Sequence, residues 1–329
     1  MSNNDNYHQL TRTFQRLSRF SHLSAIASWD MFTMMPPGGS KARGEALAEL
    51  SVLEHQLLTD PKVATWIAAA QQEDLNDVEQ ANLREMSRLH HQASLLPESL
   101  VEAKSLAGSR CEHAWRSQRP ANDWEGFSEN LKEVVKYSRE EARLRAEAKG
   151  CSPYDSLLDI FEPGMTSAQL DVLFADVKSW LPDLLNKVVA KQSQQSLIAP
   201  EGPFPTAIQR DLGLETMAQL GFDFAAGRLD ISAHPFCGGV PEDVRITTRY
   251  DENELLSALF GVIHETGHAR YEQNLPRNWS GQPIALARST AIHESQSLFF
   301  EMQLGRSKAF LTRLIPAVTR YFGDQAAFE

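Results

Sequence analysis

Apolar residues recur every three or four positions through most of the first two thirds of the chain, which is the spacing of helices that bury one face. An early stripe of this kind consists of Leu10, Phe14, Leu17 and Phe20. A later stripe, in a helix that we expect to end at Gly150, consists of Phe127, Leu131, Val134 and Val135. We expect both stripes to be core. The pattern predicts a mainly α protein with a helical scaffold over residues 1–220.

The pattern changes between residues 222 and 250. Residues 229–232 and 244–250 are rich in alternating β-branched side chains and are separated by a Gly-Gly-Val-Pro loop at 238–241. Helical spacing then returns, because Asp251 and Glu254 match a capping box and Leu256, Phe260 and Ile263 follow. We therefore expect a small β-sheet beside a helix in a subregion over 221–329. Since no linker marks a boundary, we treat residues 1–329 as one region.

The helix predicted beside the sheet carries the motif His264-Glu265-Thr266-Gly267-His268. On a helix, residues four apart lie on one face, about 40° apart, so both imidazoles can bind one metal ion. Glu265 lies on the flank of that face, where it can deprotonate a metal-bound water. Glycines cost about 1 kcal/mol inside a helix, so Gly261 and Gly267 predict close packing or a ligand at that surface. The motif predicts a zinc hydrolase.

A catalytic zinc ion usually has three protein ligands and one open position. A further helical pattern runs through Ala291, Ser295, Leu298 and Met302, and Glu294 falls on the side that this pattern predicts to be buried. A buried carboxylate is costly unless it is compensated, and a metal ion would compensate it. We favour Glu294 as the third ligand. His293, about 100° around the helix, is the rival ligand.

Composition narrows the classes of function. The net charge is −11, with no Lys/Arg-rich face to neutralise phosphates, so we expect no nucleic-acid partner. The first six residues are polar and no apolar run approaches eighteen residues, so we expect neither a signal peptide nor a membrane span. Three separated cysteines fit a reduced, cytoplasmic protein. For Cys237 we favour a packed thiol over a ligand.

Several motifs in one order resemble the carboxypeptidase Taq family, the M32 metallocarboxypeptidases. His264-Glu265-x-x-His268 is followed by Glu294 within His-Glu-Ser. Upstream lie His234-Pro235-Phe236 and Asp243-x-Arg245-x-Thr247, preceded by similar segments at 29–39 and 154–164. The resemblance implies a zincin-like (gluzincin) helical peptidase that binds Zn²⁺, for which Co²⁺ can substitute. It also implies peptide substrates and a homodimer.

Family members are longer, and their later arginine-rich motifs have no counterpart in residues 1–329. We therefore expect the C-terminal part of the family fold to be absent, and this chain to bind metal but to hydrolyse peptides poorly.

The resemblance and the residues together suggest roles. Glu265 is the expected general base. His234 is the candidate donor to the oxyanion, against a structural role before Pro235. Asp243 and Arg245 are expected beside the substrate or in hydrogen bonds that hold the metal helix, and Arg249 ranks below them. The expected activity is that of a zinc metallocarboxypeptidase. The alternatives are a zinc endopeptidase or oligopeptidase, and a metal-binding but catalytically incomplete fragment.

Overall fold

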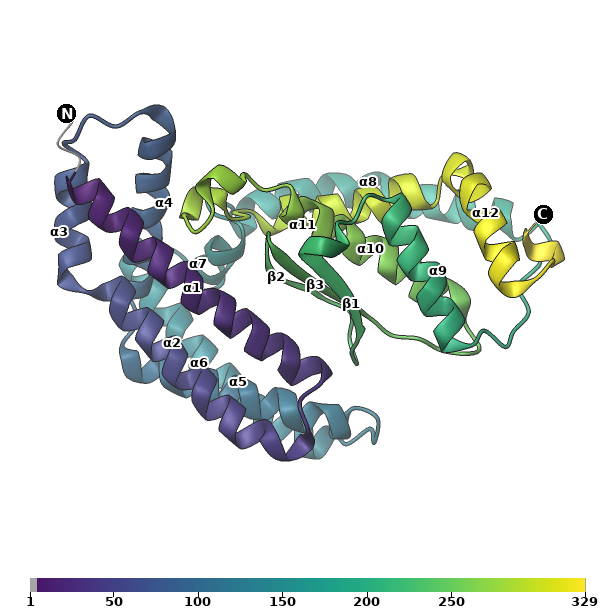
Figure 1. Ribbon diagram of the computed structural model, residues 1–329, viewed down its shortest axis with the longest axis horizontal. Coiled ribbons are helices and arrows are strands. Elements are labelled where there is room, and N and C mark those ends of the chain that lie inside the picture. Colours follow the sequence, from purple (N-terminus) through teal and green to yellow (C-terminus); the bar gives the residue numbers. More distant parts are fainter. Residues whose placement is uncertain (1–4, 329) are drawn as a thin grey trace.

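The protein is mainly helical, with one small sheet, as predicted (Figure 1). The computed structural model describes residues 5–328. Its α-helices are α1 (Asp5–Thr33), α2 (Ser40–Thr59), α3 (Pro61–Ala70), α4 (Asp77–Ser94), α5 (Glu98–Gln118), α6 (Trp124–Lys149), α7 (Pro153–Phe161), α8 (Ser167–Gln192), α9 (Thr206–Gln219), α10 (Leu255–Gln273), α11 (Thr290–Leu298) and α12 (Lys308–Phe322). A π-helical segment, Phe299–Gly305, continues α11.

The sheet has three strands in the order β1-β3-β2: β1 (Gly227–Ile231), β2 (Cys237–Val240) and β3 (Asp243–Thr248). β1 runs parallel to β3, with Leu229 opposite Ile246, and β2 runs antiparallel to β3, with Cys237 opposite Ile246. β3 packs against α10, so the predicted sheet beside the metal helix is confirmed.

The predicted loop at 238–241 is wrong, because most of it is strand β2. Gly239 has a φ of 106°, and a Cβ at this position would lie 2.0 Å from the carbonyl oxygen of Asp243. Glycine therefore permits a tight connection between β2 and β3. The Gly-rich segment, whose composition is typical of a loop, pairs with β3 as a strand.

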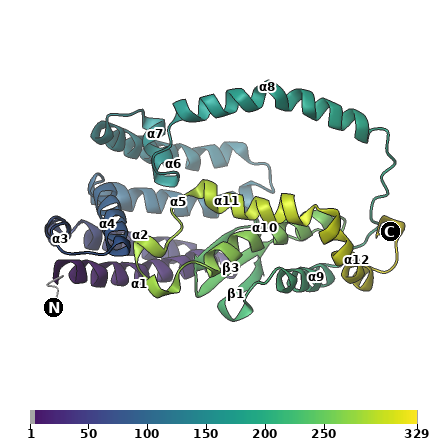
Figure 2. The ribbon, with the colours of Figure 1, turned by 90° about the horizontal axis from the view of Figure 1, so that it is seen from above.

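The helices form two groups on either side of the sheet. Helices α1 to α7 lie at one end of the molecule and α8 to α12 at the other (Figure 1). α8 runs apart from the other helices along the long axis (Figure 2), and none of its residues is buried. α9, which belongs to the predicted 1–220 scaffold, packs against α10, so the surroundings of the metal helix begin before residue 221.

Three apolar clusters form the core. One joins α1 to α3 and α4 and includes Leu10, Phe14 and Leu17, which confirms these members of the first stripe. The other two lie on two sides of α10, one with α9 and α12 and one with the sheet. The metal helix is therefore held by packing along most of its length.

The second predicted stripe, in α6, is less buried than a core stripe would be. Phe127, Leu131 and Val134 are half-buried, and Val135 is exposed. α6 instead buries residues near its C-terminal end, among them Glu141 and Arg145. The helix does end at Lys149, and Gly150 follows in the left-handed region with a φ of 68°.

The helix with the metal motif begins later than the predicted capping box implies. Its N-cap is Glu254, whose side chain accepts hydrogen bonds from the backbone N–H groups of Leu256 and Ser257. Asp251 instead accepts a hydrogen bond from the backbone of Asn253. The N-cap is usually a short polar residue, such as Asp, so the sequence favoured Asp251. The longer side chain of Glu254 reaches the N–H groups at the start of the helix instead.

In residues 5–328, no helix combines the length and the apolarity that crossing a membrane requires.

Candidate metal centre

α10 places His264 and His268 on one face, one turn apart, as their spacing requires. The backbone of α11 touches α10 at Gly267, where a Cβ would lie 2.6 Å from Cα of Ser297. Glycine permits this contact, and Glu294, one turn before Ser297, is thereby brought over the two histidines. The close packing predicted for the glycines is confirmed at Gly267. At Gly261 the nearest atom to a Cβ would be Oγ1 of Thr248, at 3.8 Å.

His264, His268 and Glu294 offer three ligand atoms that lie within 4.8 Å of one another. Nε2 of His264 is 3.6 Å from one carboxylate oxygen of Glu294, and Nε2 of His268 is 3.4 Å from the other. Two imidazole nitrogens and one carboxylate form a donor set that zinc uses in catalytic sites, with a fourth position left for water or substrate. The three residues therefore fit a divalent metal ion.

The other ring nitrogen of His264 is held by a carboxylate. Nδ1 of His264 lies 3.1 Å from Oε2 of Glu301, whose other oxygen accepts a hydrogen bond from Arg306 at 2.7 Å. A carboxylate at Nδ1 fixes the ring and leaves Nε2 as the free nitrogen. Glu301 lies in the π-helical segment after α11, so both sides of His264 depend on the same short stretch of chain.

His268 is held by a chain of two residues. Its Nδ1 lies 2.7 Å from Nδ1 of His293, and Nε2 of His293 lies 2.8 Å from Oε1 of Glu272. With Glu272 accepting from His293, the consistent arrangement has His268 donating to His293. Both nitrogens of His293, the rival ligand, are thus engaged, and Nε2 of His268 faces Glu294.

The pKa values of His268 and Glu265 differ from those of exposed groups. Burial, together with the neighbouring His293 and His264, lowers the pKa of His268 to about 4. Burial, together with the charge of Glu294, raises the pKa of Glu265 to about 7. Oε2 of Glu265 is buried and has no hydrogen-bond partner among residues 5–328. A neutral imidazole such as His268 is suited to binding a metal ion, and an unpartnered carboxylate such as Glu265 is suited to proton transfer.

Cys237 lies beside the proposed base. Burial, followed by the charges of Glu265 and Glu272, raises the pKa of its thiol well above the usual value. Among the described residues, the cluster that could hold a metal ion consists of His264, His268 and Glu294, without Cys237. This supports the packed-thiol interpretation.

The helical pattern used to choose Glu294 was predicted to mark a buried face, and this prediction is wrong. Ala291, Ser295, Leu298 and Met302 are exposed, and the side chain of Glu294 is 46% exposed. α11 ends after nine residues and continues as a π-helix, which changes the face of Met302, whereas Ala291, Ser295 and Leu298 are exposed within the regular helix. The helix touches α10 through Ser297, which is fully buried. Glu294 nevertheless meets the histidines, at the edge of that contact.

The predicted substrate residues lie elsewhere. Arg245 forms two hydrogen bonds with Asp243, at 3.0 and 2.8 Å, and its guanidinium lies 4.4 Å from the ring centre of Trp29 in α1. Asp243 also lies 3.4 Å from Nε2 of His22. This pair therefore joins β3 to α1. Arg249 is exposed.

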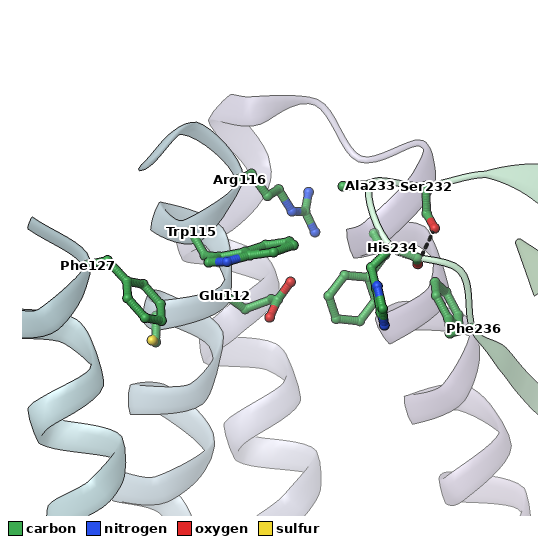
Figure 3. Close-up of a pocket in the computed structure, with 10 residues that line it drawn as sticks. Glu112, Trp115, Arg116, Phe127, Ser232, Ala233, His234 and Phe236 are labelled. Carbon is green, nitrogen blue, oxygen red and sulfur yellow. Dashed lines mark hydrogen bonds between the residues drawn. The ribbon is translucent and has the colours of Figure 1, made fainter. Parts of the chain in front are cut away.

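His234 is exposed and lines a separate cavity opposite α5 (Figure 3). Only the three predicted ligands and Glu265 are therefore brought together at the candidate centre.

Sequence reasoning missed Glu272 and Glu301. Each had a signal: Glu272 is four residues after His268, and Glu301 is seven residues after Glu294, so each shares a helical face with a ligand. The spacing could not show that Nδ1 of His264 would face Glu301, or that Glu272 would bind His293, which in turn faces Nδ1 of His268.

Comparisons with known proteins agree with this geometry. The sequence model of the family described as Carboxypeptidase Taq (M32) metallopeptidase matches residues 9–328. Thermostable carboxypeptidase 1 of Thermus thermophilus is 38% identical over 325 residues, which cover 94% of this chain and 64% of that protein. Carboxypeptidase 1 of Bacillus subtilis is 34% identical, over 91% of this chain and 60% of its own length.

Solved structures also match. Metallocarboxypeptidase 1 of Trypanosoma cruzi has a TM-score of 0.90 and 48% identity, over 99% of this chain and 66% of that one. The chain thus spans less than two thirds of the length of these relatives.

Proposed function

Because the chain belongs to the carboxypeptidase Taq (M32) family of metallopeptidases, we propose that its centre serves the zinc-dependent hydrolysis of C-terminal peptide bonds. The observation that carries this proposal is the convergence of His264, His268 and Glu294 to within 4.8 Å. Peptides are the proposed substrates, zinc is the proposed metal, and Co²⁺ is the expected substitute.

The residues around the ligands have distinct roles in this proposal. His264 and His268 would hold the metal through Nε2, with Glu294 as the third ligand. Zn²⁺ bound there supplies Lewis-acid polarisation of a carbonyl and lowers the pKa of water. Glu265 accepts a proton from the attacking water and donates it to the leaving amine. A pKa of about 7 in the metal-free centre and an unpartnered oxygen support this exchange near neutral pH.

Roles outside the centre stay predictions. The hydrogen bonds between Asp243 and Arg245, and the contact of Arg245 with Trp29, favour a role in holding β3 against α1. Arg249 is the most accessible of the predicted substrate residues. The oxyanion role of His234, the homodimer and the cytoplasmic location remain predictions too.

Two alternatives are separated by their products. A carboxypeptidase releases single residues from a free C-terminus, so amidated peptides should be poor substrates. An endopeptidase or oligopeptidase would cleave internally and accept the amide. A metal-binding chain without turnover would leave both peptides intact.

The experiment incubates the zinc-loaded chain with matched free-acid and amidated peptides and identifies the products by mass spectrometry. Glu265→Gln at equal zinc content is the control for contaminating peptidases. Slow stepwise loss of C-terminal residues from the free acid alone is the expected result. Equal cleavage of the two peptides, or internal cleavage, would contradict the proposal.

A further inference from the structure

A cavity of about 700 Å³ lies between α5 and the connection from β1 to β2 (Figure 3). This volume is in the range of about 300–1,000 Å³ that is usual for ligand pockets. Four aromatic rings line it: Phe32 from α1, Trp115 from α5, Phe127 from α6 and Phe236 from the connection. Segments from α1, the α5–α6 hairpin and the sheet thus converge on one apolar space.

The aromatic walls are fixed by contacts with one another. The rings of Phe32 and Phe236 meet edge to face, with centroids 5.5 Å apart. The guanidinium of Arg116 lies over the ring of Phe32, 5.4 Å from its centre. The hydroxyl of Ser232 donates a 2.6 Å hydrogen bond to the backbone carbonyl of His234, which holds the connecting loop in place. The space is therefore preformed, and binding would order few side chains.

A small number of polar groups face the cavity. Glu112 and Arg116 lie one turn apart on α5, and His234 projects from the opposite wall (Figure 3). Nη2 of Arg116 is buried and has no hydrogen-bond partner among residues 5–328. A buried donor without a partner is costly, so this nitrogen marks a place where a ligand acceptor would be stabilised. The opposite charges of Glu112 and Arg116 argue against a strongly charged ligand.

One short segment connects the cavity to the surroundings of the candidate metal centre. Phe236 precedes Cys237, the first residue of β2, and the Cys237 thiol lies in the field of Glu265. A second hollow of about 390 Å³ shares Trp115 and Phe127 with the cavity and extends the aromatic surface along the α5–α6 hairpin.

We propose that the cavity binds a bulky apolar side chain, aromatic or branched, of the peptide substrate, with Arg116 donating to a peptide carbonyl. This assignment rests on the proposed peptidase function for the identity of the ligand, and it names a substrate class that the metal centre does not determine. Trp115 and Phe127 are the specificity-determining residues.

A binding experiment tests the cavity without relying on turnover. The chain contains six tryptophans, and labelling with 5-fluorotryptophan gives each a ¹⁹F resonance. Trp115→Phe assigns the resonance of Trp115. The zinc-loaded Glu265→Gln variant is titrated with N-acetylated tetra-alanine peptides in which one Ala is replaced by Phe at each position in turn. At one position, the Phe peptide should move the Trp115 resonance, and tetra-alanine should not. The resonance of Trp180, on α8, is the internal control.

A kinetic experiment tests the consequence for specificity. The chain should prefer the same Phe peptide over tetra-alanine, and Trp115→Ala should reduce that ratio of kcat/KM about tenfold. Phe127→Ala repeats the test from another helix, and Tyr154→Ala, at an exposed position on α7, is the matched control.

The two experiments separate the inference from the proposed function. If no peptide is hydrolysed, the proposed function fails, and the ¹⁹F titration still decides whether the cavity binds the side chain. A Trp115 resonance that no Phe peptide moves would overturn the inference. So would an unchanged Phe preference in folded Trp115→Ala and Phe127→Ala.

Discussion

The helical scaffold and the candidate metal centre each bury carboxylates, but they treat them in opposite ways. Glu141 and Glu85, in α6 and α4, are 3% and 6% exposed, and Glu265 in α10 is 6% exposed. Glu141 pairs with Lys104 and with Arg145, and Glu85 pairs with Arg88 at 2.7 Å and Arg288 at 3.0 Å. The charged neighbour of Glu265 is another carboxylate, Glu294.

The pKa values follow these neighbours. Burial raises the pKa of a carboxyl group, but Lys104 and Arg145 hold that of Glu141 below its usual range, and Arg88 and Arg288 do the same for Glu85. At Glu265 burial and Glu294 act together, and the pKa rises to about 7. Equal burial therefore does not distinguish a structural carboxylate from the proposed general base. The presence or absence of a neighbouring cation does.

Removing the carboxylate of Glu265, the proposed general base, should have the largest effect on activity. Glu265→Gln removes the proposed general base but no ligand, so we expect a rate loss of about 10²–10⁴-fold at unchanged zinc content. Stability should be retained, because the substitution removes a buried charge without a partner. The measurement pairs peptide hydrolysis with zinc analysis and thermal unfolding. A variant that keeps its rate would show that another group moves the proton.

The structural carboxylate should show the reverse pattern. Glu141→Gln leaves Arg145 buried without its partner, which typically costs about 3–5 kcal/mol of stability. Zinc content and the rate per folded molecule should not change. Urea unfolding measures the loss, and Glu147→Gln, at an exposed position on the same helix, is the control. Loss of zinc with little loss of stability would contradict the distinction between the two regions.

The contact between His268 and His293 should have an intermediate effect. His293→Ala removes the acceptor at Nδ1 of His268 but no proposed ligand. Losses of this kind typically weaken metal affinity about 10–100-fold, so zinc should still bind at one equivalent when it is in excess. Competition with a chelator measures the affinity, with Ser295→Ala at an exposed position of α11 as the control. Complete loss of zinc would make His293 a ligand.

The smallest effect is on the pH dependence of stability. The pKa of Glu141 is lowered in the folded state, so its contribution is fully present above the unfolded-state pKa of about 4.3. It is lost as the pH falls through the lower folded-state pKa. The stability difference between wild type and Glu141→Gln should therefore shrink as the pH falls below about 4.3. A constant difference across this range would indicate that the charge of Glu141 does not carry its contribution.

Sequence reasoning located the reactive region better than its surroundings. Helical spacing predicted the shared face of His264 and His268, because residues in one helix have fixed geometry. The structure places Glu294 beside both histidines, although Ala291, Ser295 and Leu298, the stripe used to choose it, are exposed. Spacing within one helix identifies the residues that share a face, but it does not show whether that face packs against another element.

Contacts between distant segments were beyond the sequence patterns. The cavity joins Trp115 to His234, more than a hundred residues away, and the cations at Glu141 come from two helices. Strand β2 was missed because its glycines are typical of loops. Each of these features depends on how elements pack, which the spacing of residues within one element does not fix.

Anomalous diffraction at the zinc edge, from crystals of the zinc-loaded chain, would locate the metal ion that we propose His264, His268 and Glu294 to hold. We expect one anomalous peak, about 2.0–2.2 Å from Nε2 of both histidines and from a carboxylate oxygen of Glu294. His293 should remain hydrogen-bonded to His268 and outside the coordination sphere. A peak bound by His293 with Glu294 turned away, or no peak between α10 and α11, would show that these three residues do not form the metal site.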